Sequence, residues 1–295
     1  RKVYHIVQLW WVYMEPTKNI INSYHYYDPV HAYFLVYGFL SGELKSKIKI
    51  NPSYEEFDTL NRTLLENKNL DVSAVSAVNF WKLADDYYLL RSGSTQRADV
   101  GAIIVSKKKY RKEEIKDLKI AIPGRSFSGY FYYRLFFNAK EEIIFRFDKI
   151  IDAVLNDEAD IGLLIPGPAL TSAYEKFGLK KVADVLEEWM KEANGLPMPM
   201  GSYVVNKKKF SYDEALEIRK TFQESIIYAQ SHSAKAFNYA LQFSKGADPA
   251  ALKSFIEGCK LIYDMGETGI NAIRKVYEIS KKRGLIENLP DITPV

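Results

Sequence analysis

The segment from Leu118 to Leu135, LKIAIPGRSFSGYFYYRL, contains the pattern that most restricts the fold of this chain. Alternating apolar residues end at Pro123-Gly124, a short polar loop follows, and an aromatic stretch able to form a helix comes next. This order predicts a strand, a tight turn and the start of a helix. Because a strand followed directly by a helix is the repeating unit of α/β folds, the segment favours that fold class.

The loop of this unit, Arg125-Ser126-Phe127-Ser128-Gly129, is the first candidate binding site. The start of a helix presents unpaired N–H groups and a partial positive charge, so it can hold a carboxylate or a phosphate. The alternative is an ordinary connection between a strand and a helix, in which Ser128 caps the helix.

Strand-like and helix-like segments alternate through most of the chain, which predicts parallel sheets covered by helices. Capping patterns mark three helix starts: Ser53 with Glu56, Ser211 with Glu214, and Asp248-Pro249. From Ser211 onward the pattern is helical, and Gly284 closes the last long helix. The expected strands are 2–13, 47–50, 72–75, 100–105, 118–122, 143–147, 161–165 and 202–205, and further helices are expected at 31–39, from 79 and from 148.

Length and composition indicate two domains. The chain has 295 residues, of which 47% are hydrophobic, and this is long for one domain. Two crossings between domains are expected, near 106–109 and near 202–209. They divide the chain into a first α/β lobe, residues 1–105 and 203–295 with the C-terminal helices, and an inserted second α/β lobe, residues 106–202. In such an arrangement ligands bind at the carboxyl ends of the strands, in a cleft between the lobes.

Charge and cysteine content exclude several classes of partner. The formal net charge is only +4, and the lysine runs at 107–109 and 207–209 are typical of solvated turns, so no nucleic-acid partner is expected. The single cysteine, Cys259, excludes an internal disulfide and a cysteine-based zinc site, and no metal site is expected.

No apolar run reaches about 18 residues, so no membrane span is expected. The sequence assigns no oligomeric state.

The apolar segment from Ile6 to Met14 is short and lacks a small-residue cleavage site. It is therefore interpreted as a first strand rather than a signal peptide, which favours a cytoplasmic protein. If a leader had been removed before Arg1, the protein would instead be extracytoplasmic.

Common catalytic motifs such as GxSxG, Walker A and HExxH are absent from the sequence. Of the four histidines, His31 is the candidate acid or base, because it follows the exit of the first strand near Asp28, and His25 is a weaker candidate. The alternative is that both histidines pack against neighbouring tyrosines and that Asp28 caps the next helix. The expected ligand contacts are polar groups and glycines at strand ends: Asp28, Asn61, Ser76, Asn79, Ser92, Gly93, Arg125, Ser126, Ser128, Gly129, Pro166 and Gly167.

Six short segments occur in the same order in a known family: Leu60–Arg62, Asp71–Ser76, Leu90–Gly93, Ala121–Arg125, Gly195–Gly201 and Met265–Gly269. From about Asp28 to Leu285 the chain resembles the menaquinone-biosynthesis family of the futalosine pathway. It is more similar to the 1,4-dihydroxy-6-naphthoate synthases than to the chorismate dehydratases.

This resemblance implies the type 2 periplasmic-binding-protein-like fold, used in the cytoplasm as a lyase. The naphthoate synthases cleave cyclic dehypoxanthine futalosine to 1,4-dihydroxy-6-naphthoate without a cofactor. The resemblance also implies that Asn61 and Ser76 are cleft residues of the first lobe. The loop from Ser126 to Gly129 matches a threonine-rich loop that holds polar groups of the ligand.

Three departures from the family affect the interpretation. The naphthoate synthases place a histidine, the proposed base, directly after the strand that matches Ile161 to Ile165, whereas this chain has Pro166 there, in a longer loop. The threonine pair is replaced by Phe127-Ser128, and residues 1–27 do not follow the family's short opening strand. His31 is then the only nearby histidine that could replace the missing base.

Three hypotheses follow, all with a small anionic organic ligand. The first is an enzyme of this family acting on a naphthoate precursor or a related anion. The second is a non-catalytic solute-binding protein on the same fold, because an intact cleft that lacks the catalytic histidine is the pattern expected of such a protein. The third is an enzyme that acts on a different substrate.

Overall fold

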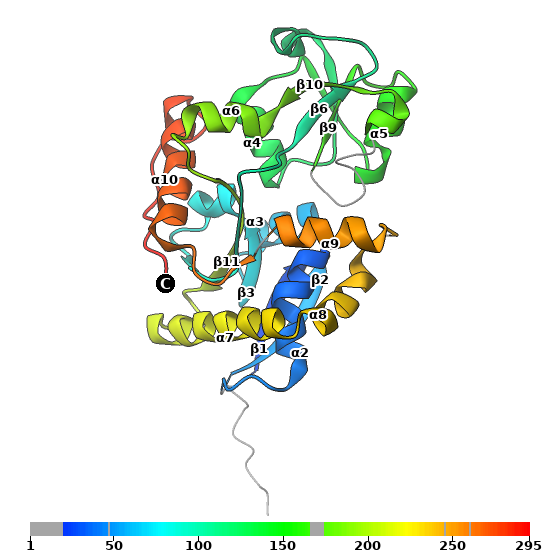
Figure 1. Ribbon diagram of the computed structural model, residues 1–295. Coiled ribbons are helices and arrows are strands. Elements are labelled where there is room, and N and C mark those ends of the chain that lie inside the picture. Colours follow the sequence, from blue (N-terminus) through cyan, green and yellow to red (C-terminus); the bar gives the residue numbers. More distant parts are fainter. Residues whose placement is uncertain (1–19, 47, 166–173, 245, 260) are drawn as a thin grey trace, which may run out of the picture.

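The chain folds into two α/β lobes, each built on its own β-sheet (Figure 1). The computed structural model describes residues 20–46, 48–165, 174–244, 246–259 and 261–295. The expected strand at residues 2–13 and the candidate ligand residues Pro166 and Gly167 lie outside these ranges. The α/β class expected from the sequence is confirmed.

The first sheet has the order β12-β5-β11-β3-β1-β2, and β4 also pairs with β11. Strand β1 is parallel to β2 and to β3, but β11 is antiparallel to β3, β4 and β5. The expectation of parallel sheets therefore holds for β1, β2 and β3 and is wrong for the rest of this sheet. Gly201, early in β11, pairs with Ser76 at the end of β3, because the chain re-enters this sheet from the other lobe at its carboxyl edge. The strands are β1 (Ile20–Tyr26), β2 (Lys49–Glu55), β3 (Val72–Ser76), β4 (Tyr87–Leu89), β5 (Ser94–Arg97), β11 (Met198–Asn206) and β12 (Leu261–Ile262).

The second sheet has the order β10-β6-β9-β7-β8 and is also mixed. Strand β7 is parallel to β8 and β9, whereas β6 is antiparallel to β9 and to β10. The strands are β6 (Ile103–Ser106), β7 (Lys119–Ile122), β8 (Glu141–Ile144), β9 (Ile161–Leu164) and β10 (Lys180–Asp184).

The chain passes between the two sheets twice. It leaves the first sheet between β5 and β6, at residues 98–102, and returns between α6 and β11, at residues 193–197. The lysine runs that were expected at the crossings instead follow β6 and β11. We therefore propose lobe boundaries at these two connections, a few residues earlier than the sequence pattern placed them.

Helices cover both sheets, and no helix of the described ranges is long and apolar enough to cross a membrane. Helices α1, η1 and α2 are continuous from Pro29 to Ser41, with a π-helical middle, and Gly42 ends them in the left-handed region at φ +75°. The α-helices are α1 (Pro29–His31), α2 (Tyr37–Ser41), α3 (Phe57–Asn67), α4 (Ser128–Phe136), α5 (Ile150–Leu155), α6 (Val185–Glu192), α7 (Tyr212–Ser231), α8 (Ser233–Ala240), α9 (Pro249–Gly258) and α10 (Gly266–Lys282). The other helical turns are the π-helix η1 (Ala32–Val36) and the 3₁₀ turns η2 (Ala77–Lys82), η3 (Lys112–Asp117), η4 (Phe147–Lys149), η5 (Tyr174–Phe177) and η6 (Leu241–Phe243).

Two of the three predicted helix caps are confirmed. Ser211 and Glu214 form a capping box at α7, and Asp248 accepts backbone hydrogen bonds at the start of α9. The capping box at Ser53 is wrong, because β2 continues to Glu55 in parallel pairing with β1 and delays α3 to Phe57. Ser128 is not a cap either, because it is the first residue of α4, after Phe127.

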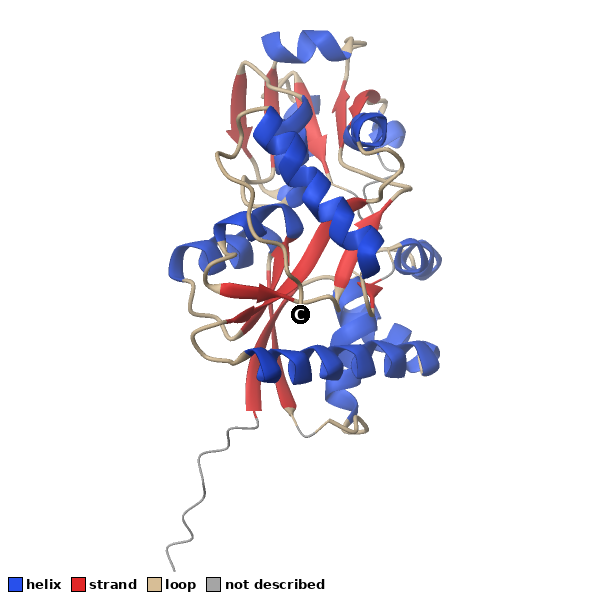
Figure 2. Ribbon diagram, turned by 90° about the vertical axis from the view of Figure 1, so that its left-hand side faces the viewer, coloured by secondary structure: helices blue, strands red, loops and turns tan. Residues whose placement is uncertain are grey.

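Helix α10 joins the two lobes along one side of the molecule (Figures 1 and 2). Its apolar face belongs to one continuous core that includes Val75 of the first lobe and Ile104 of the second. The Tyr277 hydroxyl donates to the carbonyl of Ala77 at 2.6 Å, which fixes α10 to the first lobe.

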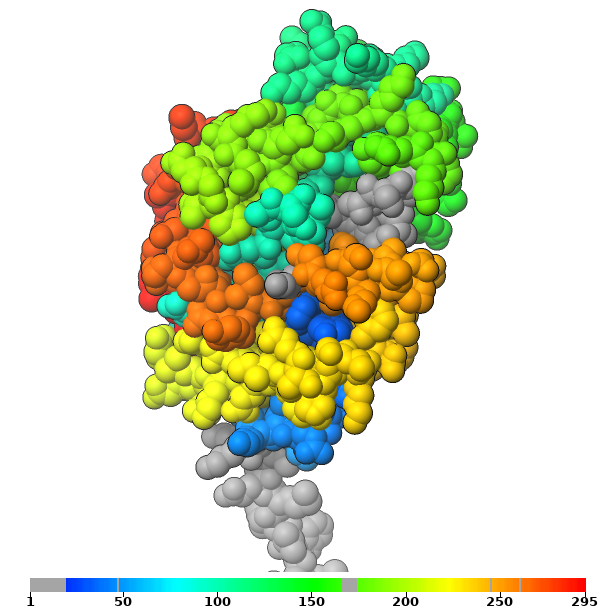
Figure 3. Space-filling model, viewed as in Figure 1, coloured from blue at the N-terminus to red at the C-terminus, as the bar shows by residue number. Residues whose placement is uncertain are grey.

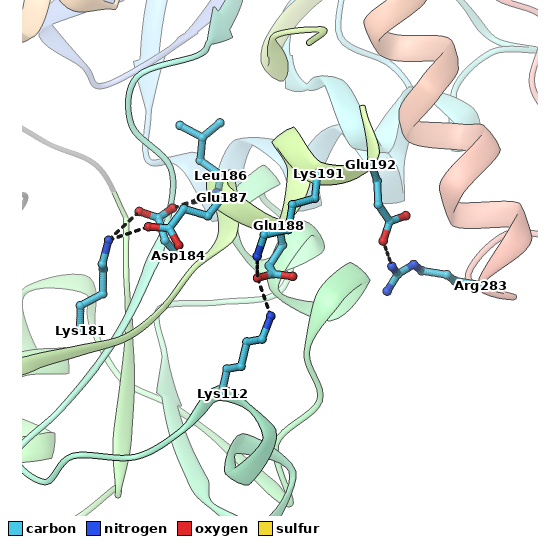
Figure 4. Close-up of polar contacts among 9 residues, drawn as sticks. All are labelled: Lys112, Lys181, Asp184, Leu186, Glu187, Glu188, Lys191, Glu192 and Arg283. Carbon is cyan, nitrogen blue, oxygen red and sulfur yellow. Dashed lines mark hydrogen bonds and ion pairs between the residues drawn. The ribbon is translucent and has the colours of Figure 1, made fainter. Parts of the chain in front are cut away.

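The other end of α10 is held by the second lobe. Arg283 donates to the carbonyl of Leu135 at 2.7 Å. It also pairs with Glu192 at the end of α6, and Figure 4 shows this pair. The same figure shows Asp184, whose carboxylate caps α6 by accepting from the Leu186 N–H at 2.9 Å. The lobes are therefore joined by packed side chains at α10 and face each other across a cleft elsewhere.

Candidate functional site

The two lobes enclose a cavity of about 100 Å³ at the carboxyl ends of β1, β3 and β7. Helix α9 (orange) lies on the rim of the first lobe, facing the second lobe (Figure 3). The cavity is lined by Tyr26, Asp28, Val30, His31, Phe57, Ser76, Thr95, Arg97, Phe127, Ser128, Gly129, Ile165, Met200, Gly201, Phe255 and Cys259.

Arg97 places a buried positive charge on the wall of this cavity. Its side chain is only 6% exposed, and its Nε and Nη2 donate to the two carboxylate oxygens of Asp99 at 2.8 and 3.0 Å. Asp99 is itself half exposed and lies outward of the arginine. This pairing uses one edge of the guanidinium, so the remaining N–H groups are suited to a carboxylate or sulphonate in the cavity.

Aromatic rings form much of the remaining wall. Tyr26 and Phe57 stack with their centroids 4.2 Å apart and their planes 20° apart, and the guanidinium of Arg97 lies 5.7 Å from the ring of Phe255. Phe127 adds a further ring from the second lobe. Flat apolar walls and one cation in the same cavity favour a planar ring that carries an acidic group.

A buried hydrogen-bonded network joins Tyr26 and Ser76 of the cavity wall through Asn61, which lies behind them. The Tyr26 hydroxyl donates to Asn61 Oδ1 at 3.1 Å, and the same oxygen accepts from the backbone N–H of Ser76 at 2.8 Å. Burial raises the pKa of Tyr26 above its usual value, so the hydroxyl stays protonated. Asn61 thus holds the end of β3 in place, while Ser76 itself reaches the cavity.

His31 lies in the cavity wall, and its Nδ1 is 2.7 Å from the hydroxyl of Tyr203. His25 lies behind it, with its Nδ1 2.6 Å from the same hydroxyl. Burial lowers the pKa of His31 to about 3 and holds that of His25 well below its usual range. Both imidazoles are therefore neutral at physiological pH. Asp28 caps the helix that carries His31, since its carboxylate accepts from the Val30 N–H at 2.7 Å.

The backbone N–H groups of the loop from Arg125 to Gly129 bind acceptors of the first lobe. Asp58 Oδ1 accepts from the N–H of Ser126 at 2.9 Å and from that of Arg125 at 3.2 Å. Ser76 Oγ accepts from the N–H of Ser128 at 3.1 Å. The predicted anion site is therefore occupied in part by the carboxylate of Asp58.

A further bond across the cleft runs from the Asn79 side-chain amide to the carbonyl of Ser126, at 2.8 Å. The bonds from Asp58, Ser76 and Asn79 thus hold the lobes in a closed arrangement.

The structure brings together five of the candidate residues at the cavity wall: Asp28, His31, Ser76, Ser128 and Gly129. Asn61, Asn79, Arg125 and Ser126 support or bridge that wall without lining it. Arg125 is largely exposed and pairs with Glu142 at 3.2 Å. Ser92 and Gly93 do not line the cavity, because the N–H of Gly93 binds the carbonyl of Ile262 in β12 and its α-carbon faces the ring of Tyr203.

Sequence reasoning missed Arg97, Thr95 and the aromatic residues Tyr26, Phe57 and Phe255. The position of Arg97 could have revealed it. Arg97 lies in the strand that directly follows Ser92-Gly93, and a buried arginine requires a functional explanation. Cys259 also reaches the cavity, and burial raises the pKa of its thiol to about 11, so it is not a thiolate nucleophile. Within the described ranges, no three His, Cys, Asp or Glu side chains are gathered so that they could hold a metal ion.

Comparison with known proteins places this chain in a family. Residues 27–282 match the family model described as menaquinone biosynthesis. The chain is 28% identical over 261 residues to the 1,4-dihydroxy-6-naphthoate synthase of Thermus thermophilus, a match that covers 87% of this chain and 93% of the relative.

Solved structures of other proteins share the fold of this chain. Protein AF1704 from Archaeoglobus fulgidus is similar with a TM-score of 0.82 and 29% identity, over 92% of this chain and 100% of that one. The periplasmic aliphatic sulphonate binding protein SsuA from Escherichia coli is similar with a TM-score of 0.63 at 10% identity, over 94% of this chain and 93% of that one. The periplasmic-binding-protein-like architecture expected from the sequence is confirmed.

Proposed function

This chain belongs to the menaquinone biosynthesis family, and on that premise we propose that it is a 1,4-dihydroxy-6-naphthoate synthase-like enzyme of the futalosine pathway. It acts as a lyase on cyclic dehypoxanthine futalosine, in the cytoplasm, and needs no cofactor. The relative from Thermus thermophilus, whose name states this activity, supports the assignment.

The observation that carries the proposal is that Arg97 and several aromatic side chains line the same cavity. A naphthoate is a planar bicyclic ring with one carboxylate, and this cavity offers one buried guanidinium beside the rings of Phe255, Tyr26 and Phe57. The carboxylate binds Arg97, the ring system lies between the aromatic side chains, and Ser76 and Ser128 face its oxygen atoms. Asp99 already balances the charge of Arg97, so the ligand carboxylate is held by hydrogen bonds from the remaining guanidinium N–H groups.

A second candidate function is non-catalytic binding of a small organic anion. It is favoured by Pro166 at the position of the family's histidine, since proline has no group that exchanges a proton. The similarity in fold to sulphonate-binding proteins agrees with it, because Arg97 suits a sulphonate as well as a carboxylate.

Incubation with cyclic dehypoxanthine futalosine distinguishes the two. We expect formation of 1,4-dihydroxy-6-naphthoate, detected by liquid chromatography with mass spectrometry, and its loss in the Arg97→Ala variant. The matched control is Arg274→Ala, which removes an arginine that binds Asn271 on α10, outside the cavity. If no product forms while added naphthoate raises the melting temperature, the protein binds without catalysis and the enzyme proposal is wrong.

A further inference from the structure

The side chains of His25, Tyr203 and His31 form a buried hydrogen-bonded chain that ends at the cavity. The Tyr203 hydroxyl lies 2.6 Å from Nδ1 of His25 and 2.7 Å from Nδ1 of His31. His25 and Tyr203 are fully buried, and His31 is 5% exposed. The three come from β1, β11 and the turn α1, so the chain links the sheet to the cavity wall.

The single hydrogen of the Tyr203 hydroxyl limits the possible directions of the two hydrogen bonds. A tyrosine hydroxyl has one hydrogen, so it donates to one Nδ1 and accepts an N–H from the other. The two imidazoles are neutral, because burial lowers the pKa of each, and burial also raises the pKa of Tyr203, which keeps its proton. One histidine therefore has its hydrogen on Nδ1 and the other on Nε2.

The surroundings of His25 decide between the two arrangements. Its Nε2 is buried and has no hydrogen-bond partner among the described residues, and its ring lies near those of Phe39 and Tyr54. A buried N–H without an acceptor is rarer in proteins than a buried acceptor without a donor. The hydrogen of His25 therefore belongs on Nδ1, where it is donated to Tyr203. The Tyr203 hydroxyl then donates to Nδ1 of His31.

We propose that the hydrogen-bonded chain His25–Tyr203–His31 keeps His31 in the tautomer with its hydrogen on Nε2. His31 then donates a hydrogen bond to a ligand oxygen in the cavity instead of accepting a proton from the ligand. His25 and Tyr203 are positioning residues for that N–H. This assignment of the His31 tautomer depends on the function proposed above only for the identity of the ligand. It replaces the role of base that the sequence assigned to His31.

The donor role agrees with the other groups at this wall. Tyr26, Asp28, Arg97 and Cys259 are the other ionisable groups among the described residues of the cavity wall, and the ring of Tyr26 lies 5.1 Å from that of His31. A neutral imidazole N–H stabilises negative charge on a ligand oxygen without first giving up a proton. Together with Arg97 it gives the cavity two donors for an oxygen-rich anion.

Nitrogen-15 NMR tests the proposal on the intact protein. The chain has four histidines, His5, His25, His31 and His232, so histidine-labelled protein gives few ring signals, which single His→Gln variants assign. Between pH 6 and 8 we expect His31 to be neutral with hydrogen on Nε2 and His25 to be neutral with hydrogen on Nδ1. The reverse pair of tautomers would overturn the proposal, whatever the protein's activity.

Two substitutions at His31 test the role in binding. His31→Gln keeps an N–H donor at the end of the side chain, whereas His31→Ala removes it. With 1,4-dihydroxy-6-naphthoate as the probe, we expect Kd to rise about tenfold or more in His31→Ala and only a few-fold in His31→Gln. Equal losses in the two variants would contradict a donor role.

Tyr203→Phe tests the positioning role, because it keeps the ring and removes the hydroxyl. We expect the ring signals of His31 to report a mixture of tautomers in this variant, with Kd raised less than in His31→Ala. An unchanged Nε2–H tautomer of His31 in a folded Tyr203→Phe variant would show that Tyr203 does not position it.

Discussion

Asp58 Oδ1 lies 2.9 Å from the backbone nitrogen of Ser126, across the cleft between the lobes. The same oxygen accepts from the N–H of Arg125, so a carboxylate of the first lobe binds the loop that begins α4 in the second lobe. The loop was predicted to bind an anion, and the anion that it binds in this structure is a side chain of the protein itself. Asp58 thus closes the cleft with the same kind of contact that a ligand carboxylate would make.

Removing this carboxylate should loosen the closed arrangement. We expect Asp58→Ala to lower the free energy of unfolding by about 1–3 kcal/mol, because two hydrogen bonds to a charged acceptor are lost. At the same time Kd for 1,4-dihydroxy-6-naphthoate should fall severalfold, because the loop N–H groups that Asp58 occupies then become available to oxygen atoms of the ligand. Urea unfolding and calorimetric titration measure the two effects.

The control is Asp58→Asn, which keeps an oxygen acceptor and should change both quantities less. A rise in Kd in Asp58→Ala would show that Asp58 supports the ligand-bound state rather than competing with it.

Gly124 should prove sensitive to substitution because of its contact with Asp58. A Cβ at Gly124 would lie 2.6 Å from Asp58 Oδ1, and its φ is +155°. We expect Gly124→Ala to lower the free energy of unfolding by about 1–3 kcal/mol. The effect should be smaller when Asp58→Ala is already present, because the clash with the carboxylate is then absent and only the Cβ of residue 58 remains, at 3.3 Å. Gly42→Ala, at a position with φ +75° and open space, is the control for backbone strain alone. Additive effects of Gly124→Ala and Asp58→Ala would rule out the contact as the cause.

Arg97 should determine affinity for anionic ligands. We expect Arg97→Gln to raise Kd for 1,4-dihydroxy-6-naphthoate by about 10- to 100-fold, since a charge-assisted pair contributes about 1.5–3 kcal/mol. Arg97→Lys should recover only part of this, because lysine keeps the charge but not the planar fork of donors. The half-exposed Asp99 stays solvated in both variants, which limits the effect on folding. Binding of naphthalene-diol without the carboxylate should change little in either variant. If Arg97→Gln binds the naphthoate as tightly as the wild type, the carboxylate lies elsewhere.

The buried histidines should make stability depend on pH in a defined window. The pKa of His31 is lowered to about 3 and that of His25 is also lowered, so between pH 6.5 and 3 the unfolded chain binds protons that the folded chain does not. The stability that they contribute is therefore complete above pH 6.5 and is lost as the pH falls. The slope is at most about 1.4 kcal/mol per pH unit for each histidine.

Urea unfolding between pH 7 and 5 measures this slope, above the range in which most carboxylates titrate. His31→Gln should reduce the slope, whereas His232→Gln, outside the cleft, is the control. A slope that is unchanged in His31→Gln would mean that His31 titrates normally in the folded protein.

Local sequence patterns predicted the strand–loop–helix units well, because those patterns depend on neighbours in the chain. Strand β7, its loop and α4 were expected within a residue or two of their observed limits. The capping box at Ser53 failed, because pairing of β2 with β1 extends to Glu55 and overrides the local preference. The antiparallel return of β11 also depends on pairing between distant segments, which periodicity along one segment does not contain.

The candidate site was predicted in part for the same reason. Residues that follow strands, such as Asp28, Ser76 and Ser128, reach the cavity because strand ends meet at one edge of each sheet. Asp58 was not expected at the anion loop, because its contact with Ser126 joins residues 68 positions apart. Arg97 and Tyr203 were missed because each lies within a strand, where the sequence alone does not show which face a side chain occupies.

The Asp58–Ser126 contact has a kinetic consequence. Because it bridges the two lobes beside the cavity, a bulky ligand gains full access only when this hydrogen bond breaks. The observed association rate constant should therefore level off at high ligand concentration, at the rate with which the lobes separate, and Asp58→Ala should raise that limit. Small anions that reach the cavity while the contact is intact would escape this limit, so the molecule would favour fast exchange of small anions and slow capture of its larger ligand.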